Sequence, residues 1–225
     1  MAYTLLSTGP PLESNIPLYW EALGGSLDSF QIDDLTQDAG LKVIQGLRQT
    51  GRRMSAQNPP KAMRRVGPSL KVFALGDYTF WSDIHIVSPR LHALIERMEP
   101  GAHQFWPVDV HVAGYRNEED YFEGSGGGDD PALRRELFDR RYLMNVCNRL
   151  DGIDLEASQP ITERGFLSYR GKDRRIVLDR RRIAGRHLWY EMRLNPRMLI
   201  VSEAFADALR AEDMTGFGLT AIEEH

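Results

Sequence analysis

The segment that decides the predicted fold is Asn195–Glu224, which reads NPRMLIVSEAFADALRAEDMTGFGLTAIEE. A short apolar strand, Met198–Val201, runs into a serine, and a helical pattern, a glycine turn and a second strand follow. A serine before a helix accepts the free amide protons of the first turn, so we interpret Ser202 as an N-cap. Gly216 is predicted to stop the helix. The segment is therefore a strand–Ser–helix–Gly–strand unit.

The same plan occurs once before, in Asp83–Val112, DIHIVSPRLHALIERMEPGAHQFWPVDVHV. Ser88 takes the place of Ser202, and Pro89 occupies the first helical position, where its missing N–H costs nothing. Gly101 matches Gly216 with one residue of slippage. Neither serine lies in the G-x-S-x-G turn of a nucleophile, so both are predicted to cap helices. The apolar residues recur at the spacing of one helix face: Leu91, Leu94, Ile95 and Met98 in one unit, Phe205, Ala208 and Leu209 in the other.

Length and composition predict a globular protein of one large or two small domains, because the chain has 225 residues and an ordinary apolar content. No apolar run reaches the ~20 residues that span a bilayer. The N-terminus lacks the basic and apolar regions of a secretory signal. Cys147 is the single cysteine, so no internal disulfide forms. These features predict a cytoplasmic protein without a membrane partner.

The order of elements predicts an α+β fold with a mainly antiparallel sheet, a few packed helices and the two similar units. Residues 1–65 are predicted to form an N-terminal lobe or extension, and residues 66–225 the main α+β domain. Asp130-Pro131 is predicted to begin a further helix with Leu133 and Leu137 on one face. We expect strands at 2–6, 71–75, 141–148, 165–170, 175–179 and 187–194, a turn with buried aromatics at 77–83, and a loop or linker at 55–68.

Charge is unevenly distributed along the chain, although the net charge is only −4. Residues 117–130 contain six acidic side chains and no basic one, and they include three consecutive glycines. The sequence predicts a mobile acidic loop there. Residues 170–186 contain eight basic and two acidic side chains. Such asymmetry steers charged partners, although solvated surface segments explain it equally well.

Two Asp-x-His pairs are the strongest candidates for chemistry: Asp83 with His85, and Asp109 with His111. Residues two apart on a strand share a face, so two neighbouring strands would bring both pairs together. His103 would add a ligand to such a mixed nitrogen and oxygen metal site. This arrangement suggests a metal-dependent hydrolase as the alternative function. The competing interpretation gives Asp83 a role in a turn and leaves the histidines at the surface.

Other chemical interpretations have less support. Cys147 lies in an apolar strand and is interpreted as a structural thiol. The glycines at 124–128 lack the lysine of a phosphate-binding loop. The basic segment 170–186 lacks the interleaved aromatics of a nucleic-acid platform, and the acidic balance argues against a nucleic-acid partner. The sequence therefore predicts no cofactor, no catalytic residue and a binding function.

Several motifs resemble one bacterial family. They are IVSPRLHALIE at 86–96, PGAHQFWPV at 100–108, the strand N-x-C-N-R-L-D-G-I-D at 145–154, and the closing LIVSEAFADAL followed by TGF. The family is the eleventh class of immunity proteins of polymorphic toxin systems. The resemblance covers roughly residues 65–225, and the segment 115–140 is longer than the family pattern needs.

The resemblance implies a cytosolic protein, a monomer or homodimer, that binds and neutralises a cognate toxin or secreted effector. Family motifs of this kind are structural, so the binding surface is expected in the variable charged parts. Many such toxins are nucleases with basic clefts, which an acidic loop would fill as a phosphate mimic. The predicted toxin-binding residues are Glu118, Glu119, Asp120, Tyr121, Phe122, Glu123, Asp129 and Asp130.

Overall fold

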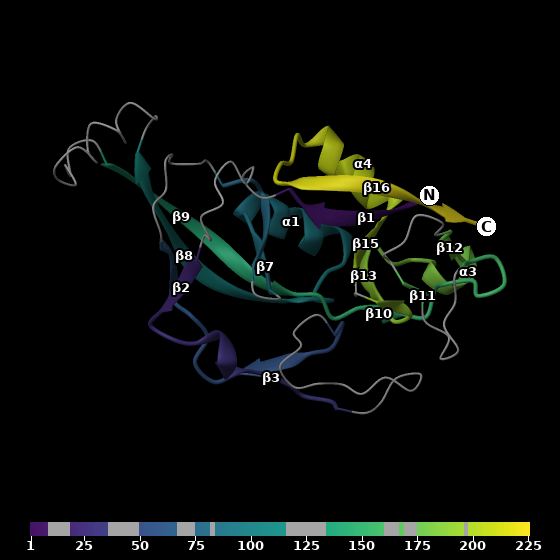
Figure 1. The fold of residues 1–225 in the computed structure, drawn as a ribbon, viewed down its shortest axis with the longest axis horizontal. Helices are drawn as coiled ribbons and strands as arrows, with labels where there is room; N and C mark the ends of the chain where they lie inside the picture. The colour runs from purple at the N-terminus through teal and green to yellow at the C-terminus, as the bar shows by residue number, and fades with distance from the viewer. Residues whose placement is uncertain are drawn as a thin grey trace.

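The computed structural model describes residues 1–8, 19–35, 50–66, 75–81, 84–115, 134–159, 167–168, 175–195 and 198–225. Two six-stranded sheets dominate this part of the chain, and two amphipathic helices pack with them (Figure 1). The α+β class and the mainly antiparallel pairing are confirmed. No helix among the described residues is long and apolar enough to cross a bilayer.

The first sheet has the strand order β2-β5-β8-β9-β7-β6. All neighbours are antiparallel except β5 and β8. The longest strands, β8 and β9, stay in register over their whole length, from Gln104 opposite Asn145 to Tyr115 opposite Arg134. The strand bounds are β2 Tyr19–Leu23, β5 Ala62–Val66, β6 Tyr78–Trp81, β7 Ile84–Val87, β8 Gln104–Tyr115 and β9 Arg134–Asn145.

The second sheet has the strand order β10-β13-β15-β1-β16-β12. Its outer pairs, β10 with β13 and β12 with β16, are parallel, and its inner pairs are antiparallel. The N-terminal strand β1 lies at the centre, between two strands from the end of the chain. The strand bounds are β1 Ala2–Ser7, β10 Arg149–Leu150, β12 Val177–Leu178, β13 Leu188–Glu191, β15 Leu199–Ser202 and β16 Phe217–Glu224.

Smaller elements complete the described fold. Strand β3 (Phe30–Ile32) pairs with β4 (Met54–Ala56), and β11 (Leu167–Ser168) pairs with β14 (Leu194–Asn195). A 3-10 turn, Leu27–Ser29, precedes β3, and the short helix α3 spans Arg180–Ile183.

The main core lies where the two sheets meet the helices α1 (Pro89–Met98) and α4 (Glu203–Ala211). Leu94 and Ile95 of α1 and Phe205 and Leu209 of α4 are at most 1% exposed. Removing such side chains from water stabilises the fold by roughly 1.5–3 kcal/mol each. A second cluster fills the other side of the first sheet under β3 and β4, and a third fills the other side of the second sheet.

The two sheets contain the same arrangement twice. In the first unit, β7 and β8 lie on either side of the antiparallel strand β9, and α1 connects β7 to β8 along the chain. Strand β6 pairs with the outer side of β7, and β5 with the outer side of β8. In the second unit, β15 and β16 lie on either side of β1, and α4 connects β15 to β16 along the chain. Strand β13 pairs with the outer side of β15, and β12 with the outer side of β16. The first unit therefore consists of α1 and the strands β5, β6, β7, β8 and β9. The second unit consists of α4 and the strands β1, β12, β13, β15 and β16.

The strand registers of the two units also correspond. Tyr78 pairs with Val87 in the first unit, as Leu188 pairs with Val201 in the second. Val87 pairs with Tyr142 of β9, as Val201 pairs with Tyr3 of β1. On the outer side, Ala62 is opposite Asp109, as Val177 is opposite Glu223. The two strand–Ser–helix–Gly–strand segments are therefore the centres of two equivalent units.

The two units differ in where their central strand occurs along the chain. In the first unit the central strand β9 follows β8, whereas in the second unit the central strand β1 comes from the opposite end of the chain. The two chain termini consequently lie close together on the second sheet (Figure 1). The division at residue 65 stays a prediction.

Several sequence expectations are wrong in detail. The predicted helix is a strand from Arg134 onward, because pairing with β8 outweighs the local helical spacing of the apolar residues. The predicted aromatic turn at 77–83 contains β6, which pairs with β7. The predicted linker 55–68 contains β5. The predicted strand residues 71–74 lie outside the described residues.

Candidate functional site

The predicted toxin-binding residues, Glu118 to Asp130, lie outside the described residues. The described strands on either side show where this acidic segment is attached. Tyr115 ends β8 and Arg134 begins β9, and these two residues are register partners. The segment therefore leaves and re-enters the fold at one point, the end of the β8–β9 ribbon.

This end of the ribbon points away from the sheet that carries the chain termini (Figure 1). Strand β7 pairs with β9 only at Tyr142–Met144, and β5 pairs with β8 only at Asp109–His111. Among the described strands, the last residues of the ribbon thus have only each other as ladder partners. The acidic segment is thus attached at the end of a projecting two-stranded ribbon.

The Asp-x-His pairs do not converge as the metal-site hypothesis requires. Strand β9 lies between β7, which carries His85, and β8, which carries His111, so the two strands are not neighbours. Asp109 instead forms an ion pair with Arg140 at 2.6 Å. Asp83 lies outside the described residues. Within the part of the chain that the structure describes, no group of three or more His, Cys, Asp or Glu is arranged to hold a metal.

His85 is buried between two tyrosines rather than exposed. Its Nδ1 lies 2.7 Å from the Tyr78 hydroxyl, and its Nε2 contacts the Tyr190 hydroxyl. Burial, together with a smaller electrostatic effect of His103, lowers the pKa of His85 to about 3. A neutral imidazole has one donor and one acceptor nitrogen, which matches two hydroxyl partners. Because Tyr78 and Tyr190 belong to different sheets, His85 joins the two units.

Both predicted caps are confirmed. Ser88 Oγ accepts the amide of Leu91, and Ser202 Oγ accepts the amide of Phe205, each at 3.1 Å. The hydroxyls have equivalent second partners. Ser88 Oγ donates to Asp77 at 2.6 Å, and Ser202 Oγ lies 2.8 Å from His187 Nδ1. The serines therefore fasten each helix to the start of the neighbouring outer strand.

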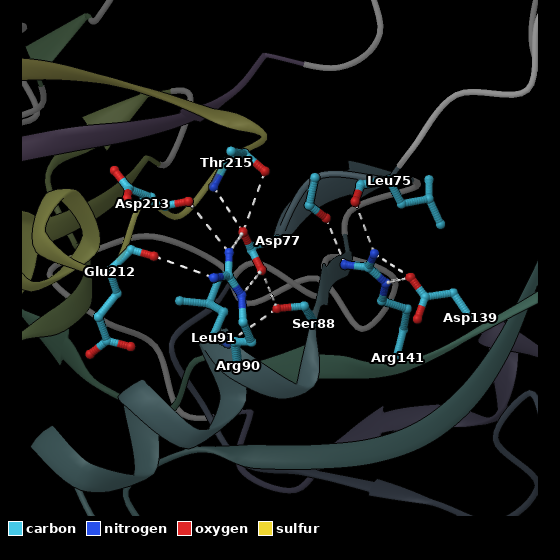
Figure 2. A network of polar contacts seen from close by, with 11 residues as sticks. Leu75, Asp77, Ser88, Arg90, Leu91, Asp139, Arg141, Glu212, Asp213 and Thr215 are labelled. Carbon is cyan, nitrogen blue, oxygen red and sulfur yellow. Dashed lines mark hydrogen bonds and ion pairs between the residues drawn. The ribbon is translucent and has the colours of Figure 1, made fainter.

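Asp77 is the centre of a polar network between the units (Figure 2). Besides Ser88, its carboxylate accepts from Arg90 at 2.7 Å and from the amide of Thr215 at 2.9 Å. Arg90 also donates to the carbonyls of Glu212 and Asp213. Burial alone would raise the pKa of Asp77, but the hydrogen bonds from Arg90, Ser88 and Thr215 outweigh it and lower the pKa to about 2. Asp77 thus ties the start of β6 to the turn after α4.

Glu99 makes the reciprocal connection at the end of α1. Its carboxylate accepts from His103 Nε2 at 2.9 Å and Asn148 Nδ2 at 3.0 Å. It also accepts the amides of His187 at 3.0 Å and Leu188 at 3.1 Å, at the start of β13. Burial would raise the pKa of Glu99, but the hydrogen bonds from His103 and the His187 amide lower it.

Together these contacts form a reciprocal junction. Glu99, after α1, accepts amides at the start of β13 in the second unit. Thr215, after α4, donates its amide to Asp77 at the start of β6 in the first unit. Gly216 has a φ of +92°, and a Cβ there would lie 2.2 Å from the carbonyl oxygen of Tyr78. Gly216 therefore permits this close contact, whereas α4 itself ends at the C-cap Glu212. The predicted stopping role of Gly216 is wrong, and its role in the junction replaces it.

The remaining predicted features also have structural roles. Cys147 is half-buried, and burial raises its pKa to about 11, so its thiol stays protonated at neutral pH. In the basic segment, Arg175 pairs with Glu223 and Arg180 with Glu224. Residues 169–174 lie outside the described part.

Sequence reasoning missed Asp77 and Glu99 as the main polar residues of the fold. One local signal exists for Glu99. An acid at the C-terminal end of a helix opposes the helix dipole, so its position there calls for compensating donors elsewhere. Those donors lie about 90 residues away at His187 and Leu188. No spacing in the sequence links them.

Comparison with known families adds an independent observation. A family model described as an immunity protein family, Imm11, matches residues 42–124 and 136–224, most of the chain. Each matched segment contains one of the strand–Ser–helix–Gly–strand segments. The match begins at residue 42, ahead of residue 65, where the resemblance read from the motifs begins. No curated protein matches the chain.

Proposed function

Because the chain belongs to the Imm11 immunity protein family, we propose that it binds and neutralises a cognate toxin in the cytoplasm, using the acidic segment 118–130. The observation that supports this choice of surface is the attachment of the segment at the end of the β8–β9 ribbon. The buried polar residues of the fold support it indirectly, because Asp77, His85 and Glu99 are occupied by contacts between the units.

The charge of the segment indicates the kind of toxin surface that it fits. Six carboxylates without a basic residue between 117 and 130 match a basic cleft, such as the one with which a nuclease binds phosphates. Tyr121 and Phe122 supply apolar anchors within the same segment. Association should be fast at low ionic strength and should weaken with added salt.

The first prediction concerns this segment. Replacing Glu118, Glu119 and Glu123 with Gln and Asp120 with Asn should weaken binding to the toxin encoded beside this gene by at least tenfold. Most of the loss should appear in the association rate, because steering depends on charge. Surface plasmon resonance at two salt concentrations measures the rates, and growth of cells that express the toxin measures protection.

The matched control removes the same number of acids from elements outside the β8–β9 ribbon. Glu156, Glu203, Asp207 and Glu223 are exposed residues outside the ribbon. Their neutral variant should bind as the natural chain does. Unchanged toxin binding by the 118–123 variant, or an equal loss in both variants, would contradict the proposed surface. The gene beside this one should encode a secreted toxin, such as a type VI effector.

A further inference from the structure

The second unit is completed by a strand that arrives from the far end of the chain. Strand β1 fills the space between β15 and β16, the place that β9 occupies in the first unit between β7 and β8. Strand β9 follows β8 along the chain, so its position is fixed by the elements on both sides of it. Strand β1 is the first described element, and the next one along the chain, β2, belongs to the first sheet.

The ladder partners of β1 all belong to the last part of the chain. Ala2 to Leu5 pair with Ser202 to Leu199 of β15. Ala2 to Ser7 pair with Ile222 to Phe217 of β16. These backbone contacts are the same whether the connection that follows β1 belongs to this copy of the chain or to another one.

Side chains and the amine of Met1 make the space selective for this strand. Ala2 is fully buried and Leu5 is 4% exposed, on opposite faces of the sheet. The ammonium group of Met1 lies 3.1 Å from Glu203 and 3.3 Å from Glu224. Arg210 stands 4.8 Å above the ring of Tyr3. The space therefore recognises the side chains of β1 as well as its backbone.

We propose that β1 is an exchangeable strand, and that two copies of this chain form a dimer in which β1 of each copy completes the second unit of the other. The exchange preserves every ladder contact of β1, so the two forms have the same contacts between β1, β15 and β16. Their proportion is then set by protein concentration. The proposal concerns the assembly of the fold and does not depend on the toxin-binding surface.

The test uses two full-length variants that can be linked only across copies. Thr4 and Thr220 are directly opposite each other in β1 and β16. One chain carries Thr4→Cys and the other Thr220→Cys, both with Cys147→Ser. The two chains are unfolded, mixed, refolded together and oxidised. A disulfide between the two introduced thiols requires β1 of one copy to lie beside β16 of the other.

Exchange predicts a covalent heterodimer on a non-reducing gel, at least tenfold more abundant than in a control mixture. In the control, Ala204→Cys on the exposed side of α4 replaces Thr220→Cys. A chain with both Thr4→Cys and Thr220→Cys shows that the variants fold in register, because it forms the disulfide within one copy at low concentration. If that chain closes its disulfide and the mixture gives no more heterodimer than the control, the proposal is overturned.

A third variant removes the freedom to exchange. Residues 1–7 are moved to the end of the chain after His225 and a short glycine linker, which makes β1 and β16 a hairpin like β8 and β9. In this variant, we expect the chain with both Thr4→Cys and Thr220→Cys to close its disulfide within one copy. The mixture of the two single-cysteine chains should give no more heterodimer than the control. A heterodimer yield equal to that of the natural chain order would show that the linkage does not arise from exchange of β1, and would also overturn the proposal.

Discussion

At the residue scale, polar side chains that the sequence marks as candidates for chemistry form structural hydrogen bonds instead. His85 was a candidate ligand and joins two tyrosines from different sheets. Ser88 has the residue type of a nucleophile and binds Leu91 and Asp77. A motif specifies a residue type and a spacing, whereas a role depends on partners that are far away in the chain. That is why the capping role was predictable and the contacts with Asp77 and Tyr190 were not.

Glu191 in β13 gives the second prediction. It is 0% exposed and accepts the amide of Gly152 at 2.9 Å. Burial raises the pKa of Glu191 to about 8, and the hydrogen bonds that it accepts do not offset this. Between pH 4.5 and 8 the folded chain therefore holds a proton that the unfolded chain releases, so stability from this group is lost as the pH rises through that window.

Glu191→Gln imitates the protonated acid and should remove this pH dependence. We expect the variant to match the natural chain near pH 4.5 and to be more stable by a few kcal/mol at pH 8, because each pKa unit corresponds to about 1.4 kcal/mol. Urea unfolding at both pH values measures the difference. The exposed Glu156→Gln should change stability by less than about 0.5 kcal/mol at either pH. An equal effect of Glu191→Gln at both pH values would contradict the prediction.

At the element scale, the sequence predicted what local chemistry determines. The two helices, their serine caps and the strands beside them follow from patterns within about 15 residues. Two elements that depend on pairing with another strand were predicted wrongly. The strand at Tyr78–Trp81 requires β7, and the strand that begins at Arg134 requires β8. The local patterns there suit a turn and a helix, and sheet pairing overrides them.

The two caps allow a matched comparison, which is the third prediction. Ser202→Ala should destabilise the fold by about 1–2 kcal/mol, because it removes an N-cap and the part-buried contact with His187 Nδ1. Ser88→Ala should cost about 2–3 kcal/mol, because it also removes a buried hydrogen bond to the charged Asp77. Chemical denaturation with a common slope measures both values. Equal losses would show that the bond of Ser88 to Asp77 stabilises the fold no more than the contact of Ser202 with His187.

At the scale of the whole molecule, the chain is two equivalent units held by a reciprocal junction. The similarity between 83–112 and 195–224 already indicated two units. The sequence did not indicate that β1 completes the second unit, because a short strand carries no information about which sheet it enters. The acidic segment was the predicted binding surface, and the structure contributes the position of its attachment on the β8–β9 ribbon.

Chain order gives the fourth prediction. Moving residues 1–7 to the end of the chain should leave the fold intact, because Ala2 and Ile222 are already opposite each other in the sheet. The free energy of unfolding should fall by no more than about 1 kcal/mol, since the lost pairs of the Met1 ammonium with Glu203 and Glu224 are partly exposed. Urea unfolding and circular dichroism provide the measurement. Loss of cooperative unfolding would show that the N-terminal position of β1 is required.

The position of β1 also has a consequence for the timing of protein synthesis. The ribosome makes β1 before every other described element, and its two neighbours, β15 and β16, after nearly all of them. At about 5–20 residues per second, β1 waits on the order of 10–40 seconds for these neighbours. A chain interrupted before β15 therefore lacks both late strands and any place for the early one. The second unit thus forms only after synthesis of β16, whereas the strands and helix of the first unit are already complete when β9 leaves the ribosome.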